Sequence, residues 1–472
     1  MRNFHQVIKK YLDNNYKIIL LLLVISVIEM LWLFVFPIWS LPDEPAHFAQ
    51  IEHYAVFKKA INQNLISKEE LNSLKFNQFN NFTEFLGHQN FTPNSLYYSN
   101  EKIFYKKNNS SSSIKDFNYK NPVEHYPPLY YILGSIIYDL FYNQNILFHA
   151  ETIRIFTILI SLVGLYFAYK IGILIFPKDK LFRYVLPITI GLFPMFDQTS
   201  VSINPGNLVN MLSIVFTYFY IKFLINPKDI KNNIYIAVTL LLGLFTKENM
   251  FILLLTYLVS IFFLIYKNHI KDIKYILYII SMVTVAILIM ILSNLMNIIS
   301  SYTEALISHT TNFSFISYIL SFGPNYYFPT GRVFQSFWGN FGWLTIPFSI
   351  QLFDILYIIT VLSIIGLGVY LYKNIHNKNI FKIFIFLFLE AIIYTLFLML
   401  LDYSSLKNGA GNFTQGHYFL FIIAPIMILF ITGITALFKE KYKNLAYLSI
   451  ITFFILLNTY SLFHLLIPTF YI

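Results

Sequence analysis

Uncharged apolar blocks of roughly 20 residues recur along almost the whole chain, and this pattern constrains the fold more than any other feature. An α-helix of about that length crosses the roughly 30 Å of hydrocarbon in a bilayer. Short polar connectors separate the blocks, and hydrophobic residues make up 57% of the 472 residues. The sequence therefore predicts an all-α polytopic membrane protein, with residues 1–472 forming a single integral membrane domain.

The apolar blocks predict a bundle of about eleven transmembrane helices. Their expected bounds are 18–39, 152–176, 183–201, 207–225, 233–247, 249–266, 275–296, 350–372, 381–401, 417–437 and 444–466. One further candidate, residues 127–142, is short, opens on two prolines and carries Asp139. Its length of about 16 residues falls below that of a full crossing.

The placement of the basic residues predicts how the helices are oriented. When 127–142 is not counted as a span, most Lys and Arg fall in connectors of one face, namely 1–17, 170–183, 222–231, 267–274, 373–382 and 439–443. Because cytoplasmic loops are rich in Lys and Arg, we expect a multi-pass protein of the cell membrane with a cytoplasmic N-terminus and an external C-terminus. The net charge of +10 then reflects topology and does not indicate a nucleic-acid partner.

The same orientation places three long segments on the external side, residues 40–151, 297–349 and 402–416. Residues 40–126 form a large first external loop, and residues 297–349 form a second. Residues 127–142 are expected to be an interfacial helix that lies in the outer surface of the bilayer. Any chemistry is therefore expected on the external face.

The stretch P-D-E-P-A-H-F, residues 42–48, places two carboxylates and an imidazole directly after the first apolar block. Proline is tolerated in a first helical turn, so a helix is expected to begin at Asp43 or Glu44 and to end near Ile61. Asp43 and His47 would share one polar stripe of that helix. Ionisable groups near a bilayer are often functional, and this stretch is therefore a candidate site.

Two other interpretations of this stretch remain open. A carboxylate at the start of a helix can cap its free N–H groups and stabilise it by roughly 1 kcal/mol. A divalent cation is the other alternative, with candidate ligands Asp43, Glu44, His47, His53 and His125. None of their spacings is diagnostic of a metal. The chain has no cysteine, which excludes disulfides and thiolate ligands.

Six short blocks resemble, in the same order, blocks of one bacterial membrane-protein family. They are P-D-E-P-A-H-F (42–48), H-Y-P-P-L-Y-Y (125–131), S-I-N-P (202–205), F-T-K-E (245–248), S-F-W-G-N-F-G-W-L (336–344) and Q-G-H-Y-F-L (415–420). The family is the domain-of-unknown-function 2142 family. It is in turn similar to glycosyltransferases of the GT-C superfamily, of the protein O-mannosyltransferase and aminoarabinose transferase type.

The resemblance implies a GT-C-like bundle with juxtamembrane helices in the first external loop. It also implies a polyprenyl-phosphate-linked sugar as donor and Asp43 as the catalytic carboxylate. Two positions depart from the family pattern, because His417 stands where arginine is usual and Gly206 stands where an acidic residue is usual. One fixed positive charge and one carboxylate are thereby missing.

Glycosyl transfer to a hydroxyl needs a base for the acceptor proton and positive charge for the departing phosphate. Asp43 is the candidate base, while Glu44 would orient the acceptor, bind a cation or cap the helix. For the phosphate we expect Lys247 first, followed by Arg332 and His417. A lysine at the end of a span also fits a side chain that reaches the interface and pairs with a neighbouring carboxylate.

Other candidate substrate-binding residues are His47, His125, Asn204, Gln415 and Trp338. Trp338 also fits the aromatic belt that membrane proteins place at the interface. The two prolines after His125 also fit a purely structural use, because proline fixes the backbone where a helix begins.

Together these features predict a membrane glycosyltransferase that acts on the external face. It would transfer a sugar from a polyprenyl-phosphate-linked donor to a cell-surface glycan, lipid or protein, and membrane lipids would surround it. The sequence indicates no definite cofactor, and a divalent cation is the alternative given above. A transporter or flippase of lipid-linked glycans is the alternative from another class, since such proteins place ionisable groups near mid-membrane, as Glu29, Asp354 and Glu390 would be. An O-antigen-type polymerase would also have a large external loop.

Overall fold

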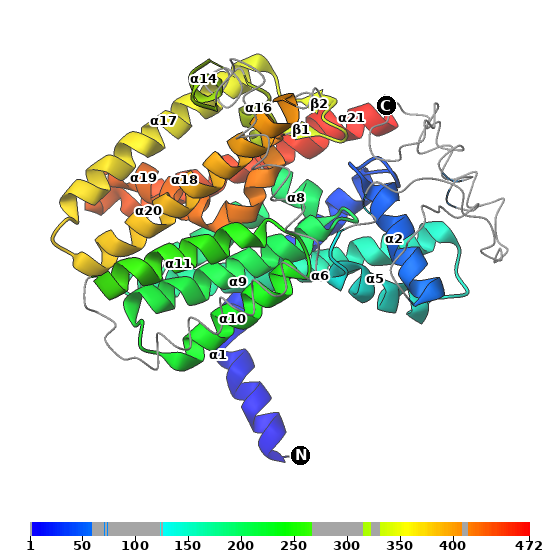
Figure 1. Cartoon of the computed structure of the whole chain (residues 1–472), viewed down its shortest axis with the longest axis horizontal. Helices are drawn as coiled ribbons and strands as arrows, with labels where there is room; N and C mark the ends of the chain where they lie inside the picture. The colour runs from blue at the N-terminus through cyan, green and yellow to red at the C-terminus, as the bar shows by residue number, and fades with distance from the viewer. Residues whose placement is uncertain are drawn as a thin grey trace.

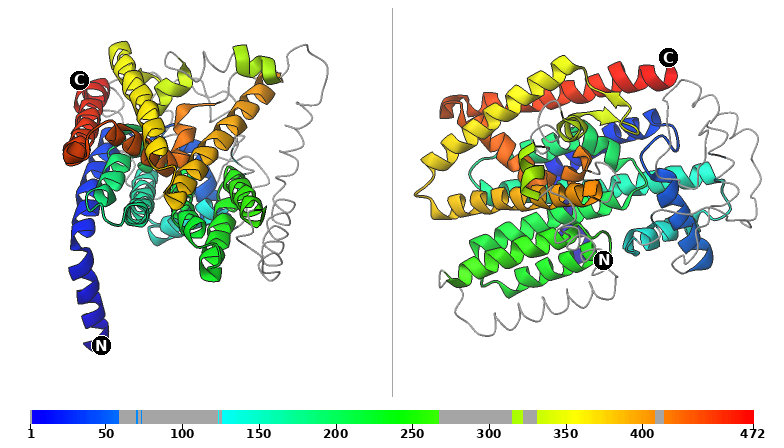
Figure 2. Two further views of the ribbon diagram at one scale, coloured as in Figure 1. Left: turned by 90° about the vertical axis from the view of Figure 1, so that its left-hand side faces the viewer. Right: turned by 45° about the horizontal axis from the view of Figure 1, so that its top comes forward.

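The computed structural model describes residues 2–58, 70, 73, 123, 126–266, 315–321, 331–407 and 414–472. Within these residues the chain is a helical bundle with one two-stranded hairpin, made of β1 (Asn340–Phe341) and β2 (Ile346–Pro347) (Figure 1). The N-terminal part of α1 (Arg2–Val35) projects from the bundle, as Figure 1 and the left-hand view of Figure 2 show. The predicted all-α fold class is confirmed.

The helices of the first half of the chain have the following bounds: α2 (Glu44–Phe57), α5 (Leu129–Leu140), α6 (Ile146–Ile175), α7 (Phe182–Gly191), α8 (Pro194–Ser200), α9 (Pro205–Ile225), α10 (Ile230–Leu244) and α11 (Met250–Tyr266). Those of the second half are α14 (Phe315–Ser321), α16 (Arg332–Trp338), α17 (Ile350–Lys373), α18 (Lys378–Lys407), η1 (Gly416–Ile422), α19 (Ile423–Ala436), η2 (Glu440–Tyr442), α20 (Lys443–Tyr460), η3 (Ser461–Leu466) and α21 (Ile467–Tyr471).

Seven described helical stretches are long and apolar enough to cross a bilayer: Asn15–Val35, Ile146–Ile175, Pro205–Ile225, Ile350–Lys373, Lys378–Lys407, Gly416–Ala436 and Glu440–Tyr471. The predicted continuous span 183–201 is wrong, because the chain breaks into α7 and α8 at Phe193, whose backbone is extended. Pro194 cannot donate a helical hydrogen bond there. The expected spans 233–247 and 249–266 are the shorter helices α10 and α11, and 275–296 lies outside the described residues.

Small residues let α17 and α19 pack closely side by side. A Cβ atom at Gly366 would lie 2.0 Å from the carbonyl oxygen of Gly433, and one at Gly433 would lie 2.1 Å from that of Ser363. The Ser363 hydroxyl also donates to the carbonyl oxygen of Phe430 at 3.1 Å. Since hydrocarbon offers no hydrophobic drive between helices, such close contacts and hydrogen bonds hold membrane bundles together.

Contacts between distant segments show which helix ends lie together. Asp179 accepts from the Tyr447 hydroxyl at 2.8 Å and pairs with Lys443 at 3.1 Å, so two of the basic connectors meet at one end of the bundle. At the other end, Arg154 near the start of α6 contacts Glu44 at the start of α2. The chain between α1 and α6 therefore leaves and rejoins the bundle at one end, as expected of a loop.

The helix α2 is shorter and more deeply buried than expected. It ends at Phe57, and Lys58 adopts a left-handed conformation with φ 54°. All side chains from Glu44 to Ala55 are buried, including His47 of the expected polar stripe. The reason is that α5 packs against α2, where a Cβ atom at Gly134 would lie 2.7 Å from Cδ1 of Ile51. That α5 lies in the membrane interface stays a prediction.

Candidate functional site

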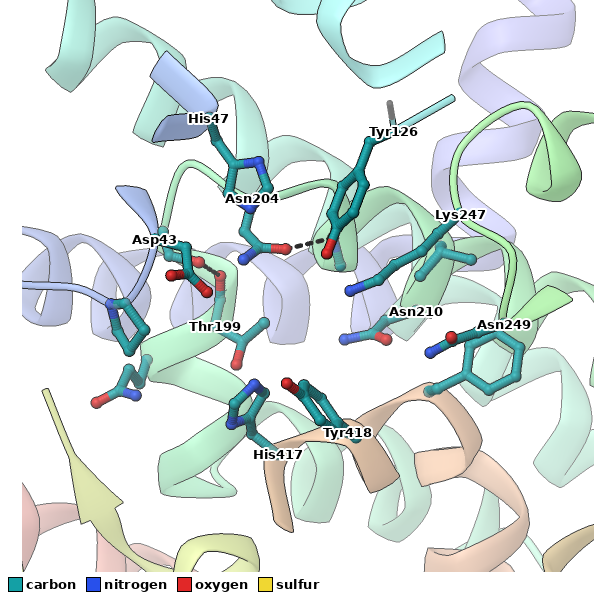
Figure 3. A pocket seen from close by; sticks show the side chains of 16 residues that line it. Asp43, His47, Tyr126, Thr199, Asn204, Asn210, Lys247, Asn249, His417 and Tyr418 are labelled. Carbon is teal, nitrogen blue, oxygen red and sulfur yellow. Dashed lines mark hydrogen bonds between the residues drawn. The ribbon is translucent and has the colours of Figure 1, made fainter. Parts of the chain in front are cut away.

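A polar pocket lies where the ends of α2, α8, α9, α10 and η1 converge (Figure 3). Its volume of about 70 Å³ is several times the roughly 10–15 Å³ that one water molecule needs, so water and polar substrate atoms can enter it. The lining residues are Pro42, Asp43, His47, Tyr126, Gln198, Thr199, Ser202, Asn204, Gly206, Val209, Asn210, Lys247, Asn249, His417, Tyr418 and Phe421.

Asp43 lines this pocket from the turn that precedes α2. Its backbone is left-handed, with φ 58° and ψ 5°, a conformation that costs most residues about 1–2 kcal/mol but that aspartate tolerates better. Its side chain makes no capping hydrogen bond to α2, although its carbonyl oxygen accepts from the amide of His47 at 3.1 Å. The capping interpretation is therefore wrong for Asp43, whose carboxylate is turned toward the pocket.

Glu44 follows Asp43 in the chain but lies in a different environment. Both of its carboxylate oxygens accept from the guanidinium of Arg154, at 2.7 and 2.6 Å, and both side chains are fully buried. The backbone amides of Trp39 and Ile203 donate to the same oxygens at 3.1 and 3.3 Å. Glu44 does not line the pocket, so the expectation that it orients an acceptor or caps α2 gives way to a buried ion pair.

Arg154 ties this ion pair to the end of the first span. Its guanidinium also donates to the carbonyl oxygens of Phe36 and Pro37, at 2.8 and 3.1 Å. A buried ion pair is favourable only when its remaining polar atoms are satisfied, and here they are. The pair thus fixes the backbone from Phe36 to Glu44, including the turn that presents Asp43.

Lys247 enters the pocket from the turn between α10 and α11. Its Nζ atom lies 5.7 Å from the ring centroid of Tyr126 and 5.9 Å from that of Tyr418, within the range of cation–π contacts. The side chain therefore points into the pocket between two rings, and the alternative of a lysine that reaches the interface stays a prediction. Burial lowers the pKa of Lys247, while the charges of Glu248 and Asp43 oppose that shift.

His47 faces the same pocket from the first turn of α2. Its Nδ1 atom lies 2.9 Å from the hydroxyl oxygen of Tyr131, and its ring lies 5.8 Å from that of Tyr126. Burial, followed by the charge of Lys247, holds the pKa of His47 well below its usual range. The imidazole is therefore neutral at physiological pH.

Asn204 both lines the pocket and caps α9. Its side-chain oxygen accepts from the amide of Gly206 at 2.7 Å. A Cβ atom at Gly206 would lie 2.9 Å from that oxygen. An acidic side chain at 206 would thus compete with this cap for space, which gives the glycine at this position a structural reason.

Of the remaining candidates, which lie in or next to η1 and α16, only His417 of η1 belongs to the site. His417 lines the pocket, and Lys247 and Arg332 are near enough to act on it electrostatically. Arg332 and Gln415 do not line the pocket. Trp338 is buried and packs on Phe193 with ring centroids 5.6 Å apart, so it belongs neither to an aromatic belt nor to a sugar platform.

One comparison decides the family of the chain. The model of a family described as "Predicted membrane protein (DUF2142)" matches residues 27–455. The chain belongs to the DUF2142 family. A search of curated proteins found no match.

Two solved structures are similar to this DUF2142 protein. The oligosaccharyltransferase of Archaeoglobus fulgidus, in its apo form, has a TM-score of 0.46 at 11% identity, with 96% of this chain and 55% of that chain covered. ArnT from Cupriavidus metallidurans, bound to undecaprenyl phosphate, has a TM-score of 0.43 at 11% identity, with 96% and 73% covered. The chain thus spans little over half the length of the oligosaccharyltransferase. Neither likeness assigns a function to this chain.

The described residues of the DUF2142 protein contain no cluster of metal-ligating side chains that would support the metal interpretation. No group of three or more His, Asp or Glu is placed there to hold a metal ion. Among the candidate ligands, Glu44 is engaged by Arg154, and His125 lies outside the described residues. Dependence on a metal stays untested.

Several pocket residues had no role in the expectations from sequence. Tyr126 and Tyr418 stand inside two of the quoted blocks, next to His125 and His417, so the blocks themselves carried the signal. Asn210 is a polar residue inside an apolar span, one turn after Gly206, which is a second signal. For Thr199, the sequence offers no signal that separates it from an ordinary helical threonine.

Proposed function

We propose that this protein is a membrane glycosyltransferase. It transfers a sugar from a polyprenyl-phosphate-linked donor to a hydroxyl of a cell-surface glycan, lipid or protein. The supporting observation is that Asp43 and Lys247 line one pocket, where the charge of the carboxylate acts on the ammonium group. A base and a cation held together are the two groups that transfer from a phosphate requires.

In the proposed reaction the acceptor oxygen bonds to the anomeric carbon, and its proton passes to the carboxylate of Asp43. The bond between that carbon and the phosphate oxygen breaks, and the lipid phosphate leaves with the electron pair. Lys247 balances the negative charge that develops on the phosphate. The rings of Tyr126 and Tyr418 hold the ammonium in place and limit its contact with water.

In the proposed orientation of the protein in the membrane, the pocket lies on the external face. The connectors that contain Asp179 and Lys443 lie at the opposite end of the bundle, and basic connectors are typical of the cytoplasmic side. The N-terminus is then cytoplasmic and the C-terminus external.

Because the chain has no cysteine, Gln144→Cys and Lys228→Cys each introduce a single label site. An impermeant maleimide should label intact cells at 144 and not at 228; the reverse pattern would invert the topology.

The proposed activity is tested on the surface glycans of cells that carry Asp43→Asn at the abundance of the unmodified protein. We expect one sugar to disappear from the glycan profile. Asp179→Asn is the matched control, because Asp179 is a paired carboxylate at the opposite end of the bundle. An unchanged profile with Asp43→Asn would contradict the glycosyltransferase.

One observation favours a transporter of lipid-linked glycans as the second candidate. Glu390 is fully buried in the middle of α18, and neither carboxylate oxygen has a hydrogen-bond partner among the described residues. The other two acids support it less, since Asp354 is exposed and Glu29 accepts from Ser161 at 2.7 Å. Lipid scrambling in vesicles that contain the purified protein, lost on Glu390→Gln, would favour the transporter.

A further inference from the structure

We propose that Tyr131 fixes His47 as a neutral imidazole whose Nε2–H group donates a hydrogen bond into the pocket, to an oxygen of the sugar phosphate. The substrate in this statement rests on the proposed function, whereas the tautomer does not. His47 then acts as a donor that positions substrate, and Tyr131 is a positioning residue that acts through it. His47 is then excluded as the base, because such an imidazole has no free lone pair, and this is consistent with Asp43 as the base of the proposed function.

The geometry places Tyr131 where it can hold the imidazole rigidly. Its hydroxyl oxygen lies 2.9 Å from Nδ1 of His47, and the two rings are stacked at 6.0 Å with an angle of 28°. On its other side, Tyr131 is stacked on Tyr54 at 6.2 Å with an angle of 1°. Both members of the hydrogen bond are buried, with 2% of His47 and 0% of Tyr131 exposed.

The direction of this hydrogen bond follows from the hydroxyl proton. Within the described residues, Nδ1 of His47 is the one hydrogen-bond partner found for the Tyr131 hydroxyl. If Nδ1 were the donor, the buried hydroxyl proton would lack an acceptor, at a cost of roughly 1–3 kcal/mol. Tyr131 therefore donates and Nδ1 accepts, so the single proton of the neutral ring is on Nε2.

The surrounding charges keep both groups in these protonation states. Lys247 faces His47 across the pocket and disfavours an imidazolium, whereas Asp43, in the turn before α2, is the acid that lines the same pocket. Burial, followed by neighbouring tyrosines, raises the pKa of Tyr131 well above its usual range, so its hydroxyl keeps the proton. A neutral donor beside a cation suits an anionic or hydroxyl oxygen and repels a cationic substrate.

The tautomer can be measured without any substrate. Nitrogen-15 NMR of the full-length protein labelled at histidine, with the His47 signals assigned by their loss in His47→Gln, distinguishes protonated Nε2 from protonated Nδ1. We expect a neutral ring with the proton on Nε2 at neutral pH, and a shift in the Nδ1 resonance on Tyr131→Phe. Tyr130→Phe is the control, because Tyr130 contacts Tyr131 edge-on while no hydrogen bond joins its hydroxyl to His47 among the described residues. A proton on Nδ1, or an imidazolium, would overturn the proposal.

The functional part is tested by two amides that imitate one ring nitrogen each. The amide nitrogen of Gln reaches about as far as Nε2, and that of Asn about as far as Nδ1. At matched abundance, sugar transfer to surface glycans should be about 10-fold lower for His47→Asn than for His47→Gln, the value of one lost hydrogen bond. His149→Gln is the control, since His149 is buried and stacked on Tyr138 but does not line the pocket.

The transfer assay and the NMR measurement test different parts of the proposal, and either part can be contradicted without the other. Equal transfer by His47→Asn and His47→Gln would overturn the donor role, even if the tautomer were as expected. If the unmodified protein transferred no sugar at all, the proposed function would fail, whereas the NMR result on Tyr131 and His47 would still decide the tautomer.

Discussion

Two carboxylates that are neighbours in the chain lie in opposite environments. The side chain of Glu44 is enclosed by Arg154 and by two backbone amides, so its charge is fully balanced inside the protein. The side chain of Asp43 lines a polar pocket with Lys247 and His47. The difference indicates that the Glu44 carboxylate stabilises the turn before α2, while that turn directs the Asp43 carboxylate into the pocket.

The left-handed backbone of Asp43 connects the two environments. A change of direction at φ 58° separates the residue that packs inward from the residue that faces the pocket. Arg154 holds the chain before this turn through Phe36 and Pro37, and holds the chain after it through Glu44. Changes on the enclosed side should therefore alter stability, and changes on the pocket side should alter binding and transfer.

The largest effect is expected from Arg154→Met, which leaves the carboxylate of Glu44 buried without a cation. The free energy of unfolding should fall by about 3–5 kcal/mol, and the double variant with Glu44→Gln should recover part of that loss. Chemical unfolding in detergent micelles measures both. Arg183→Met is the control, because Arg183 donates to a single carbonyl oxygen near the opposite end. A loss below about 1 kcal/mol would show that the pair does not hold the turn.

On the pocket side, Lys247→Met should weaken the binding of undecaprenyl phosphate by about 10-fold or more, since a hydrogen bond to a charged group contributes about 1.5–3 kcal/mol. Lys247→Arg should keep most of the affinity. Binding of the phosphate requires the charged form of Lys247, which is lost as the pH rises. Because burial lowers the pKa of Lys247, this loss of binding should begin at a lower pH than it would with an ordinary lysine.

Native mass spectrometry or a fluorescence titration of the purified protein gives the dissociation constants for these lysine variants. Lys58→Met is the matched control, because Lys58 pairs with Asp139 and its side chain is 65% exposed. Equal affinities for Lys247→Met and Lys58→Met would remove Lys247 from the phosphate site.

A third carboxylate, Asp179, gives the smallest effect and calibrates the comparison. Burial alone would raise the pKa of Asp179, but the amide of Phe182, the Tyr447 hydroxyl and Lys443 together lower it. Its stabilising contribution is therefore present above the unfolded pKa of about 3.9 and is lost as the pH falls through the lower folded value.

Asp179→Asn should thus reduce the free energy of unfolding by about 0–1 kcal/mol at neutral pH, and by less in acid. Unfolding curves at several pH values measure this dependence. A variant that became relatively less stable as the pH fell would contradict the assignment of the shift.

The sequence was enough for the fold class and for naming five residues that line the pocket, Asp43, His47, Asn204, Lys247 and His417, but not for showing that they lie together. Apolar blocks predict the helices because hydrocarbon requires internal hydrogen bonding, and the quoted blocks contain Asp43, Lys247 and His417, which line one pocket. The role of Glu44 could not be predicted, because its partner Arg154 lies 110 residues away in the chain. Trp338 was misplaced for the same reason, since its burial depends on Phe193 and other distant rings.

Local backbone geometry was also beyond the sequence. An aspartate directly before a helix usually caps it. Asp43 does not, because its left-handed backbone directs the carboxylate away from α2. Likewise, Pro194 inside an apolar block did not show that α7 and α8 are separate helices, because proline is tolerated in many spans.

The account is tested most directly by Asp43→Asn and Glu44→Gln, purified side by side and incubated with the lipid extract of cells that lack the protein. Asparagine tolerates the left-handed backbone, so Asp43→Asn should keep the melting temperature of the unmodified protein and lose sugar transfer by about 100-fold or more. Glu44→Gln should lower the melting temperature. Transfer by Asp43→Asn within a few fold of the unmodified protein would contradict the central claim that this carboxylate takes the acceptor proton.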